Sequence, residues 1–122
     1  HYSNPSGVRA TCSDCHVPKK SWFSKMHRKV VAAKDVWAEL MGTIDTKEKF
    51  EAKRMEMAKR EWARMKESDS IGCRNCHSFE GMDIESQAKG ARNQHTQAAM
   101  AGSGKTCIDC HKGIAHRLPR VQ

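Results

Sequence analysis

The chain has 122 residues, of which 38% are hydrophobic, 6% are aromatic and 30% are charged, and its formal net charge is +8. This length fits one domain, residues 1–122, and the small apolar fraction excludes a large core built from side chains alone. No apolar run approaches the ~20 residues of a membrane-spanning helix, and no nucleic-acid-binding motif accompanies the positive charge, so we expect no nucleic-acid partner.

The first element along the chain is Cys12-Ser13-Asp14-Cys15-His16, and its pattern, Cys-x-x-Cys-His, occurs twice more. This pattern attaches haem c: both thiols bond to the porphyrin vinyl groups, and the histidine becomes the proximal ligand of the iron. A zinc site would use two Cys pairs and leave the third pair and three histidines unexplained. The other copies are Cys73-Arg74-Asn75-Cys76-His77 and Cys107-Ile108-Asp109-Cys110-His111. We therefore predict three covalently bound haem c groups.

A long helix is predicted after the first motif, from Trp22 to about Leu40. Ser21 or Ser24 can cap its start, and a glycine follows its end. His27 falls within the apolar stripe of this helix, at helical spacing from its apolar neighbours. It is either a packed core residue or an iron ligand, and the three irons that need a sixth ligand favour ligation.

Two more helices are predicted further along the chain. One has a capped start at Asp45-Thr46-Lys47-Glu48, with Glu48 completing a capping box, and runs to about Lys66. The other runs from Ser86 to Met100 and is rich in small residues around His95, which lets a helix approach a flat ring closely. His95 is therefore the best distal-ligand candidate.

The chain has seven histidines, and the motifs use His16, His77 and His111 as proximal ligands. The four that remain for three distal positions are His1, His27, His95 and His116. His116 follows the last motif by only five residues, too short a path to reach the far face of that haem, so we expect it to be the spare one. Irons with two imidazoles each have no open position, which favours electron transfer over reduction of a small molecule at iron.

The cofactors also bear on charge and location. Two propionates per haem would offset much of the positive charge of the chain. Haem c is attached outside the bacterial cytoplasmic membrane, so we expect a location on the periplasmic side of that membrane. The predicted fold is all-α, a small multihaem domain in which helices and loops wrap around the three haems with little or no strand.

Several segments together resemble the NapC/NirT family of membrane-anchored multihaem cytochromes c, and the resemblance covers essentially the whole chain. The matching segments are His1-Tyr2-Ser3-Asn4, Gly7 to Pro18, Lys34 to Trp37, Gly42 to Ile44 and Cys107 to His116. The resemblance implies that members take electrons from membrane quinol and pass them to periplasmic reductases or other multihaem partners.

Carried over by position, the resemblance implies three distal ligands. His95 would be distal to the haem of His16, His27 to the haem of His77, and His1 to the haem of His111. His116 would have no iron. Lys29 and Asp35 fall near the family's quinol site.

Members of the family usually begin with a membrane helix and a further haem motif, and neither is present in these residues. We expect a fourth haem and a membrane anchor upstream, association with the membrane through that anchor, and a larger complex. The predicted function is transfer of electrons from menaquinol or ubiquinol to a periplasmic or membrane-bound redox protein, as part of a quinol dehydrogenase. The alternative is a soluble or complex-bound trihaem relay without quinol oxidation.

Overall fold

Helix α2 (Trp22–Leu40) has the bounds that the sequence predicted. The computed structural model describes residues 1, 7–99 and 103–119. The hydroxyl group of Ser21 accepts a hydrogen bond from the backbone N–H of Ser24 at 3.1 Å and caps the start of the helix. At its end, Gly42 has a φ of 69°, and the N–H of Thr43 reaches back to the carbonyl of Ala38. This is a Schellman motif, in which glycine takes the left-handed position.

Helix α3 (Lys47–Glu67) starts one residue later than predicted. Its N-cap is Thr46, whose hydroxyl group accepts from the N–H of Lys49 at 3.3 Å. The predicted capping box of Asp45 and Glu48 is therefore wrong, because the Asp45 carboxylate instead accepts a hydrogen bond from Nζ of Lys49 at 2.8 Å. The helix ends in a second Schellman-type turn, which leads directly into the central Cys-x-x-Cys-His motif.

The remaining helices are short. They are α1 (Cys12–His16), α4 (Ile71–Arg74), α5 (Lys89–Ala99) and α6 (Cys107–Cys110). Helix α5 begins three residues later than predicted because Ser86 and Gln87 bond back to the turn before them, and the predicted end at Met100 lies outside the described residues. The described part of the chain contains helices and turns but no strand, which confirms the all-α class.

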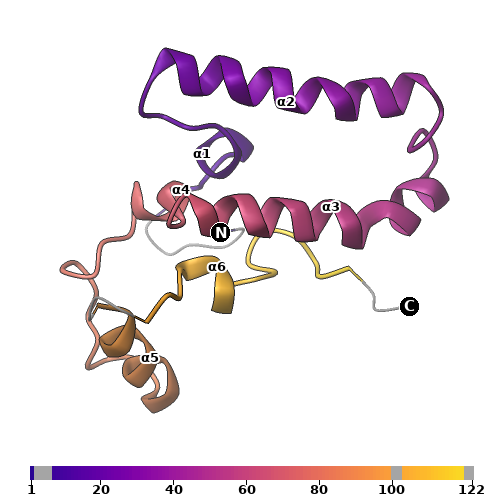
Figure 1. The fold of residues 1–122 in the computed structure, drawn as a ribbon. Coiled ribbons are helices and arrows are strands. Elements are labelled where there is room, and N and C mark those ends of the chain that lie inside the picture. Colours follow the sequence, from indigo (N-terminus) through magenta and orange to yellow (C-terminus); the bar gives the residue numbers. More distant parts are fainter. Residues whose placement is uncertain (2–6, 100–102, 120–122) are drawn as a thin grey trace.

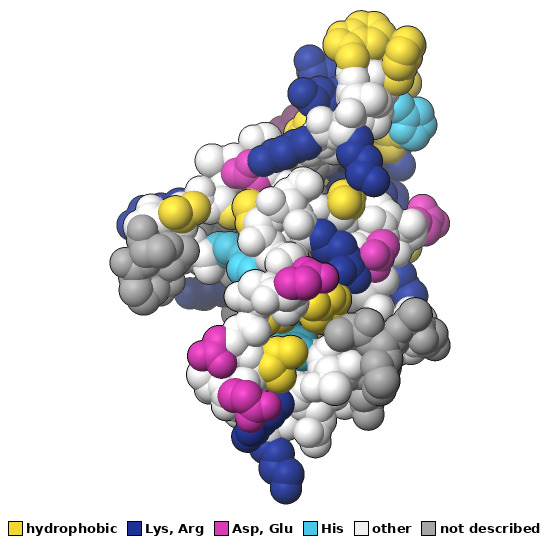
Figure 2. Space-filling model, turned by 90° about the vertical axis from the view of Figure 1, so that its left-hand side faces the viewer, with side chains coloured by type: hydrophobic (Ala, Val, Ile, Leu, Met, Phe, Trp, Pro, Cys, Tyr) yellow, Lys and Arg dark blue, Asp and Glu magenta, His cyan; other side chains and the backbone are white. Residues whose placement is uncertain are grey.

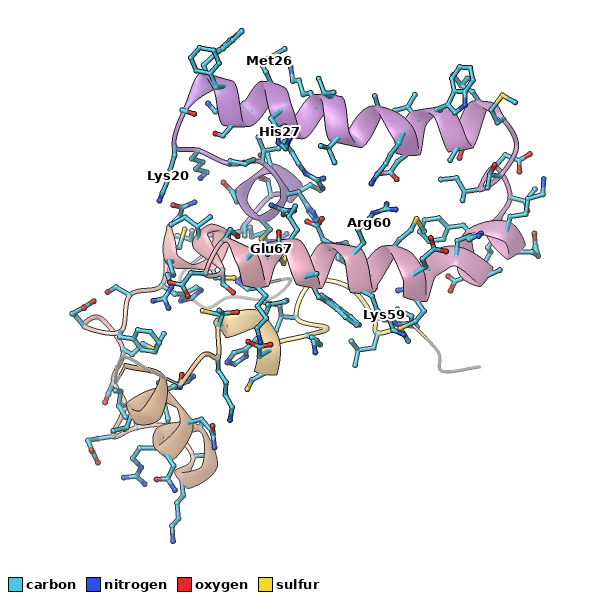
Figure 3. The ribbon with its side chains drawn as sticks, in the orientation of Figure 1. Lys20, Met26, His27, Lys59, Arg60 and Glu67 are labelled. Carbon is cyan, nitrogen blue, oxygen red and sulfur yellow. The ribbon has the colours of Figure 1, made fainter. Side chains whose placement is uncertain are left out.

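Helices α2 and α3 run antiparallel and are joined by the turn at Gly42 (Figure 1). Helix α1 lies between them, near the start of α2, while α6 lies against α3 on the side away from α2, and α5 stands apart (Figure 1). Two ion pairs link the long helices, Arg28 to Glu61 at 3.1 Å and Arg60 to Asp35 at 2.7 Å. Arg60 rises from α3 toward α2 (Figure 3).

The polypeptide buries very little of itself. Among the described residues only Ile108 and Ser70 are buried. The chain exposes 9490 Å², whereas a folded monomer of this mass exposes about 6600 Å². Large apolar side chains remain exposed along α2, and Figure 2 shows hydrophobic side chains projecting at the top of the molecule. The exposed apolar residues of α2 are Trp22, Phe23, Met26, Val30, Val36, Trp37 and Leu40.

Candidate functional site

The three Cys-x-x-Cys-His motifs meet at the short segment 70–72. A Cβ atom on Gly72 would lie 3.0 Å from the backbone oxygen of Cys15, so glycine lets α4 approach α1 closely. On the other side, the buried hydroxyl group of Ser70 lies 3.0 Å from the hydroxyl oxygen of Thr106 and accepts from the N–H of Ile108. One three-residue segment therefore contacts both outer motifs.

The two outer motifs share a local device that starts their helices. The Asp14 carboxylate accepts from the N–H of Thr11 at 2.7 Å, and the Asp109 carboxylate does the same with Thr106. The pKa of Asp14 is lowered by the hydrogen bond from Lys19 and then by Thr11, and the pKa of Asp109 by Thr106 and then Lys66. Both carboxylates stay charged and hold the motif turn.

None of the six cysteines, all of which lie in the described residues, forms a disulfide bond. Burial raises the pKa of Cys73, and the neighbouring thiols Cys107 and Cys15 raise it further. Burial also raises the pKa of Cys15, followed by the charges of Asp14 and Cys76. Thiols of different motifs therefore raise one another's pKa.

A cavity of about 860 Å³ lies between α1, α2, α3, α4 and α6. This volume is in the range of cofactor pockets. Its walls include cysteines of all three motifs and apolar side chains of α3. These cysteines are Cys15, Cys73 and Cys107, and the apolar residues of α3 are Ala58, Trp62 and Met65.

Three pairs of histidine rings lie at closely similar separations. The ring centroids are 6.1 Å apart for His1 and His77, 5.9 Å for His95 and His111, and 6.1 Å for His16 and His116. A metal held between two imidazoles lies about 2 Å from each nitrogen, which puts the ring centroids about 6 Å apart. Each motif histidine thus has a second imidazole at about the separation at which two imidazoles would hold a metal ion.

These neighbours differ from the pairs that the resemblance implied. The structure brings His1 to His77 and His95 to His111, and it places His116, the expected spare histidine, beside His16. His27 lies exposed on α2 (Figure 3). The distal assignments therefore stay predictions. Among the described residues no group of three or more His, Cys, Asp or Glu side chains is arranged to hold a metal ion by itself.

Two of the predicted ligands have their Nδ1 atoms hydrogen-bonded to the protein. Nδ1 of His16 lies 2.8 Å from Oε1 of Glu61, and Nδ1 of His95 bonds to the side-chain oxygen of Gln87. Because both partners accept with oxygen, the imidazoles carry their proton on Nδ1 and keep Nε2 for a metal. The donor set therefore fits haem iron.

Glu61 also accepts hydrogen bonds from Arg28 at 3.1 Å and from Arg64. Burial acts to raise the pKa of Glu61, but the hydrogen bonds from His16 and Arg64 outweigh it and lower the pKa to about 2. The residue is thus a charged carboxylate beside a proximal histidine. The sequence reasoning missed it, because an acidic residue on a helix rich in Lys, Arg and Glu carries no local signal.

The two residues expected near a quinol site are not brought together. Asp35 is paired with Arg60 of α3. Lys29 is exposed on α2, and six residues of helix place it about 120° around the axis from Asp35. These described residues do not form one pocket with each other.

Comparison with known proteins decides the family. The family model described as "NapC/NirT cytochrome c family, N-terminal region" matches residues 1–121. The chain belongs to this family. No solved structure matches it. As a member of the NapC/NirT family it is a c-type cytochrome, a class of protein that binds haem covalently.

Curated relatives are similar in sequence over almost the entire chain. The "Denitrification system component NirT" of Stutzerimonas stutzeri is 60% identical, with 98% of this chain and 58% of that protein covered. The "Cytochrome c-type protein NapC" of Escherichia coli K12 is 56% identical over 100% of this chain and 60% of its own length. A protein of Allochromatium vinosum whose name describes a tetraheme cytochrome c is 54% identical, with 98% and 63% covered.

The chain therefore spans about three fifths of the length of these relatives. In the part of the chain that the structure describes, no helix is both long and apolar enough to cross a membrane.

Proposed function

We propose that this chain is the electron-carrying domain of a quinol-linked respiratory cytochrome on the periplasmic side of the cytoplasmic membrane. It holds three haems, one on each Cys-x-x-Cys-His motif, with His16, His77 and His111 as proximal ligands. His1, His27 and His95 supply the distal imidazoles. Each iron then has two nitrogen ligands and exchanges electrons without binding a substrate.

The single cavity that reaches all three motifs carries this proposal. Cofactors attached around one cavity lie close to one another, so electrons can pass along the set. When bound, haem supplies the one-electron chemistry of its iron, and the chain supplies attachment, ligands and charge.

Basic side chains around the cavity suit the carboxylates of haem. Each haem brings two propionates, and the cavity walls carry more basic than acidic side chains. These cations would neutralise the propionates and orient the rings. The basic residues are Lys19, Lys20, Arg28, Arg54, Arg60, Arg64 and Arg117.

The donor is proposed to be menaquinol or ubiquinol and the acceptor a periplasmic or membrane-bound redox protein. One observation favours the alternative, a trihaem relay that does not oxidise quinol. Asp35 forms an ion pair with Arg60, and Lys29 lies on a different side of α2. A quinol site that uses these residues therefore needs another part of the protein, such as an upstream segment with a fourth haem and a membrane anchor.

Two measurements test the proposal. Intact mass of the denatured protein counts the covalent haems, and a mass of His1 to Gln122 with fewer than three haems would contradict it. Addition of menaquinol to the full-length protein in membranes should then reduce the haems rapidly. A complete haem set that menaquinol fails to reduce would instead support the relay.

A further inference from the structure

We infer that Glu61 is a positioning residue for the haem of the first motif: its carboxylate orients the His16 imidazole and lowers the midpoint potential of the iron that this imidazole ligates. The inference rests on the proposed attachment of a haem at Cys12 and Cys15. It adds a role for a residue outside the three motifs.

The contact is long-range in sequence and well placed in space. Glu61 lies in the second half of α3, 45 residues from His16, and its Oε1 is 2.8 Å from Nδ1 of the imidazole. The side chains are only 20% and 35% exposed. A hydrogen bond at Nδ1 fixes the rotation of the ring about its axis and directs Nε2 to the metal, as partners of metal-bound histidines do.

The carboxylate itself is held from both sides. Nη2 of Arg28, on α2, bonds to Oε2 at 3.1 Å, and Nε of Arg28 donates to the backbone carbonyl of His16 at 3.2 Å. Arg64 donates to both carboxylate oxygens from one turn along α3. Glu61 therefore has little freedom to turn away from the imidazole.

The direction of the effect follows from charge. A negative carboxylate at Nδ1 makes the imidazole a stronger electron donor, and this stabilises ferric iron more than ferrous iron. The neutral amide of Gln87, which bonds to His95, exerts a weaker effect of the same kind. The two arginines reduce the effect of Glu61 by partly neutralising its charge.

The test is a redox titration of the haem-loaded, full-length protein, followed by absorption and by electron paramagnetic resonance. Glu61→Gln keeps an oxygen acceptor but removes the charge. In this variant one redox component of the titration, the haem of the first motif, should be more easily reduced. We expect its ratio of reduced to oxidised iron at a fixed potential to rise about tenfold, which is a 59 mV rise in midpoint for one electron. The ferric resonance of the same component should change.

Arg28→Gln separates electrostatics from a structural effect. It removes a contact between α2 and α3 but leaves the bond from Glu61 to His16, so the carboxylate becomes less neutralised and the midpoint should fall. The matched control is Glu56→Gln, which removes the same charge from an exposed i,i+3 pair with Lys53 on the same helix. This control should leave the midpoint potential of every haem unchanged.

Two results would overturn the inference. One is a shift of Glu61→Gln and Arg28→Gln in the same direction, because that indicates only a loosened contact between helices. The other is a Glu61→Gln titration that matches Glu56→Gln. The intact mass of each variant distinguishes failure of this inference from failure of the proposed function. A full haem count with unchanged midpoint potentials overturns the role of Glu61 alone. Absence of haem at the first motif overturns both the role of Glu61 and the proposed function.

Discussion

Ser70 has the most completely buried side chain among the described residues, with 1% exposure, although it is small and polar. Its hydroxyl group connects two haem motifs by bonding to Thr106 and to the N–H of Ile108. Its backbone has a φ of 50°, in the left-handed region that side chains other than glycine rarely adopt. The native contacts must therefore offset the strain of this conformation.

Replacement of Ser70 by alanine should destabilise the haem-loaded protein by about 1–3 kcal/mol, because a buried N–H group at Ile108 loses its acceptor. Urea unfolding followed by circular dichroism measures the change. The control is Ser86→Ala, since Ser86 is exposed and bonds only to its own turn, and it should stay within about 0.5 kcal/mol of the parent. Equal stability of the two variants would show that Ser70 does not join the motifs.

Gly72 gives a second test at the same junction. In Gly72→Ala the added Cβ would meet the backbone of Cys15 at 3.0 Å and that of Asp14 at 3.3 Å. Backbone atoms cannot rotate away, so we expect a loss of about 1–3 kcal/mol in the free energy of unfolding. Gly90→Ala, within α5 and with no atom near the added Cβ, should instead stabilise by about 0.5–1 kcal/mol. A neutral Gly72→Ala would contradict the close approach of α1 and α4.

At the scale of single residues, the sequence predicts which side chains carry the haem chemistry better than it predicts which distant side chains contact one another. The sequence predicts the haem-binding cysteines and the proximal histidines because their spacing is local. Glu61 and Ser70 act on partners 45 and 36 residues away, and no local pattern indicates such contacts. The five residues between His111 and His116 limit only the approach of His116 to its own haem, whereas the C-terminal segment places His116 beside His16.

At the scale of elements, α2 and α3 were predictable because their ends depend on neighbouring residues. Ser21 and Gly42 mark the ends of α2 by their own chemistry. The start of α3 was misplaced by one residue because Asp45 and Thr46 are both good caps, and Asp45 is used by Lys49 instead. What the sequence did not predict is how α2 is held, by ion pairs to α3 rather than by a shared apolar face.

The exposed stripe of α2 supports a haem ligand there. Phe23 and Val30 are 78% and 69% exposed on either side of His27, and a porphyrin face would cover all three. His27→Ala should therefore convert one of the three proposed haems from low spin to high spin, while His116→Ala should leave all of them low spin. Absorption and magnetic circular dichroism spectra of the two variants distinguish these outcomes. The reverse result would establish the ring contact of His116 with His16 as the ligand pair and remove His27 from the set.

At the scale of the whole molecule, the exposed surface of 9490 Å² exceeds the ~6600 Å² of an ordinary monomer of this mass. Side chains alone cannot supply the missing interior, because only Ile108 among the described apolar residues is buried. Three porphyrins would provide large apolar faces for the residues that the polypeptide leaves exposed, and their covalent bonds would restrict the unfolded chain.

The chain produced without haem attachment should accordingly lack a stable fold. We expect its far-UV circular dichroism to show less than half of the helix signal of the haem-loaded protein, and its urea titration to lack a cooperative transition. The haem-loaded protein, measured in the same buffer, is the control. A haem-free chain with the full helix signal and a sharp unfolding transition would show that the polypeptide folds stably without haem.

The junction at residues 70–72 also has a consequence for biogenesis. Its contacts reach back to Cys15 and forward to Ile108, so the half of the junction that contacts the third motif cannot form until synthesis of the chain has passed Ile108. The first and central motifs can therefore come together before the third, which joins them last through Ser70.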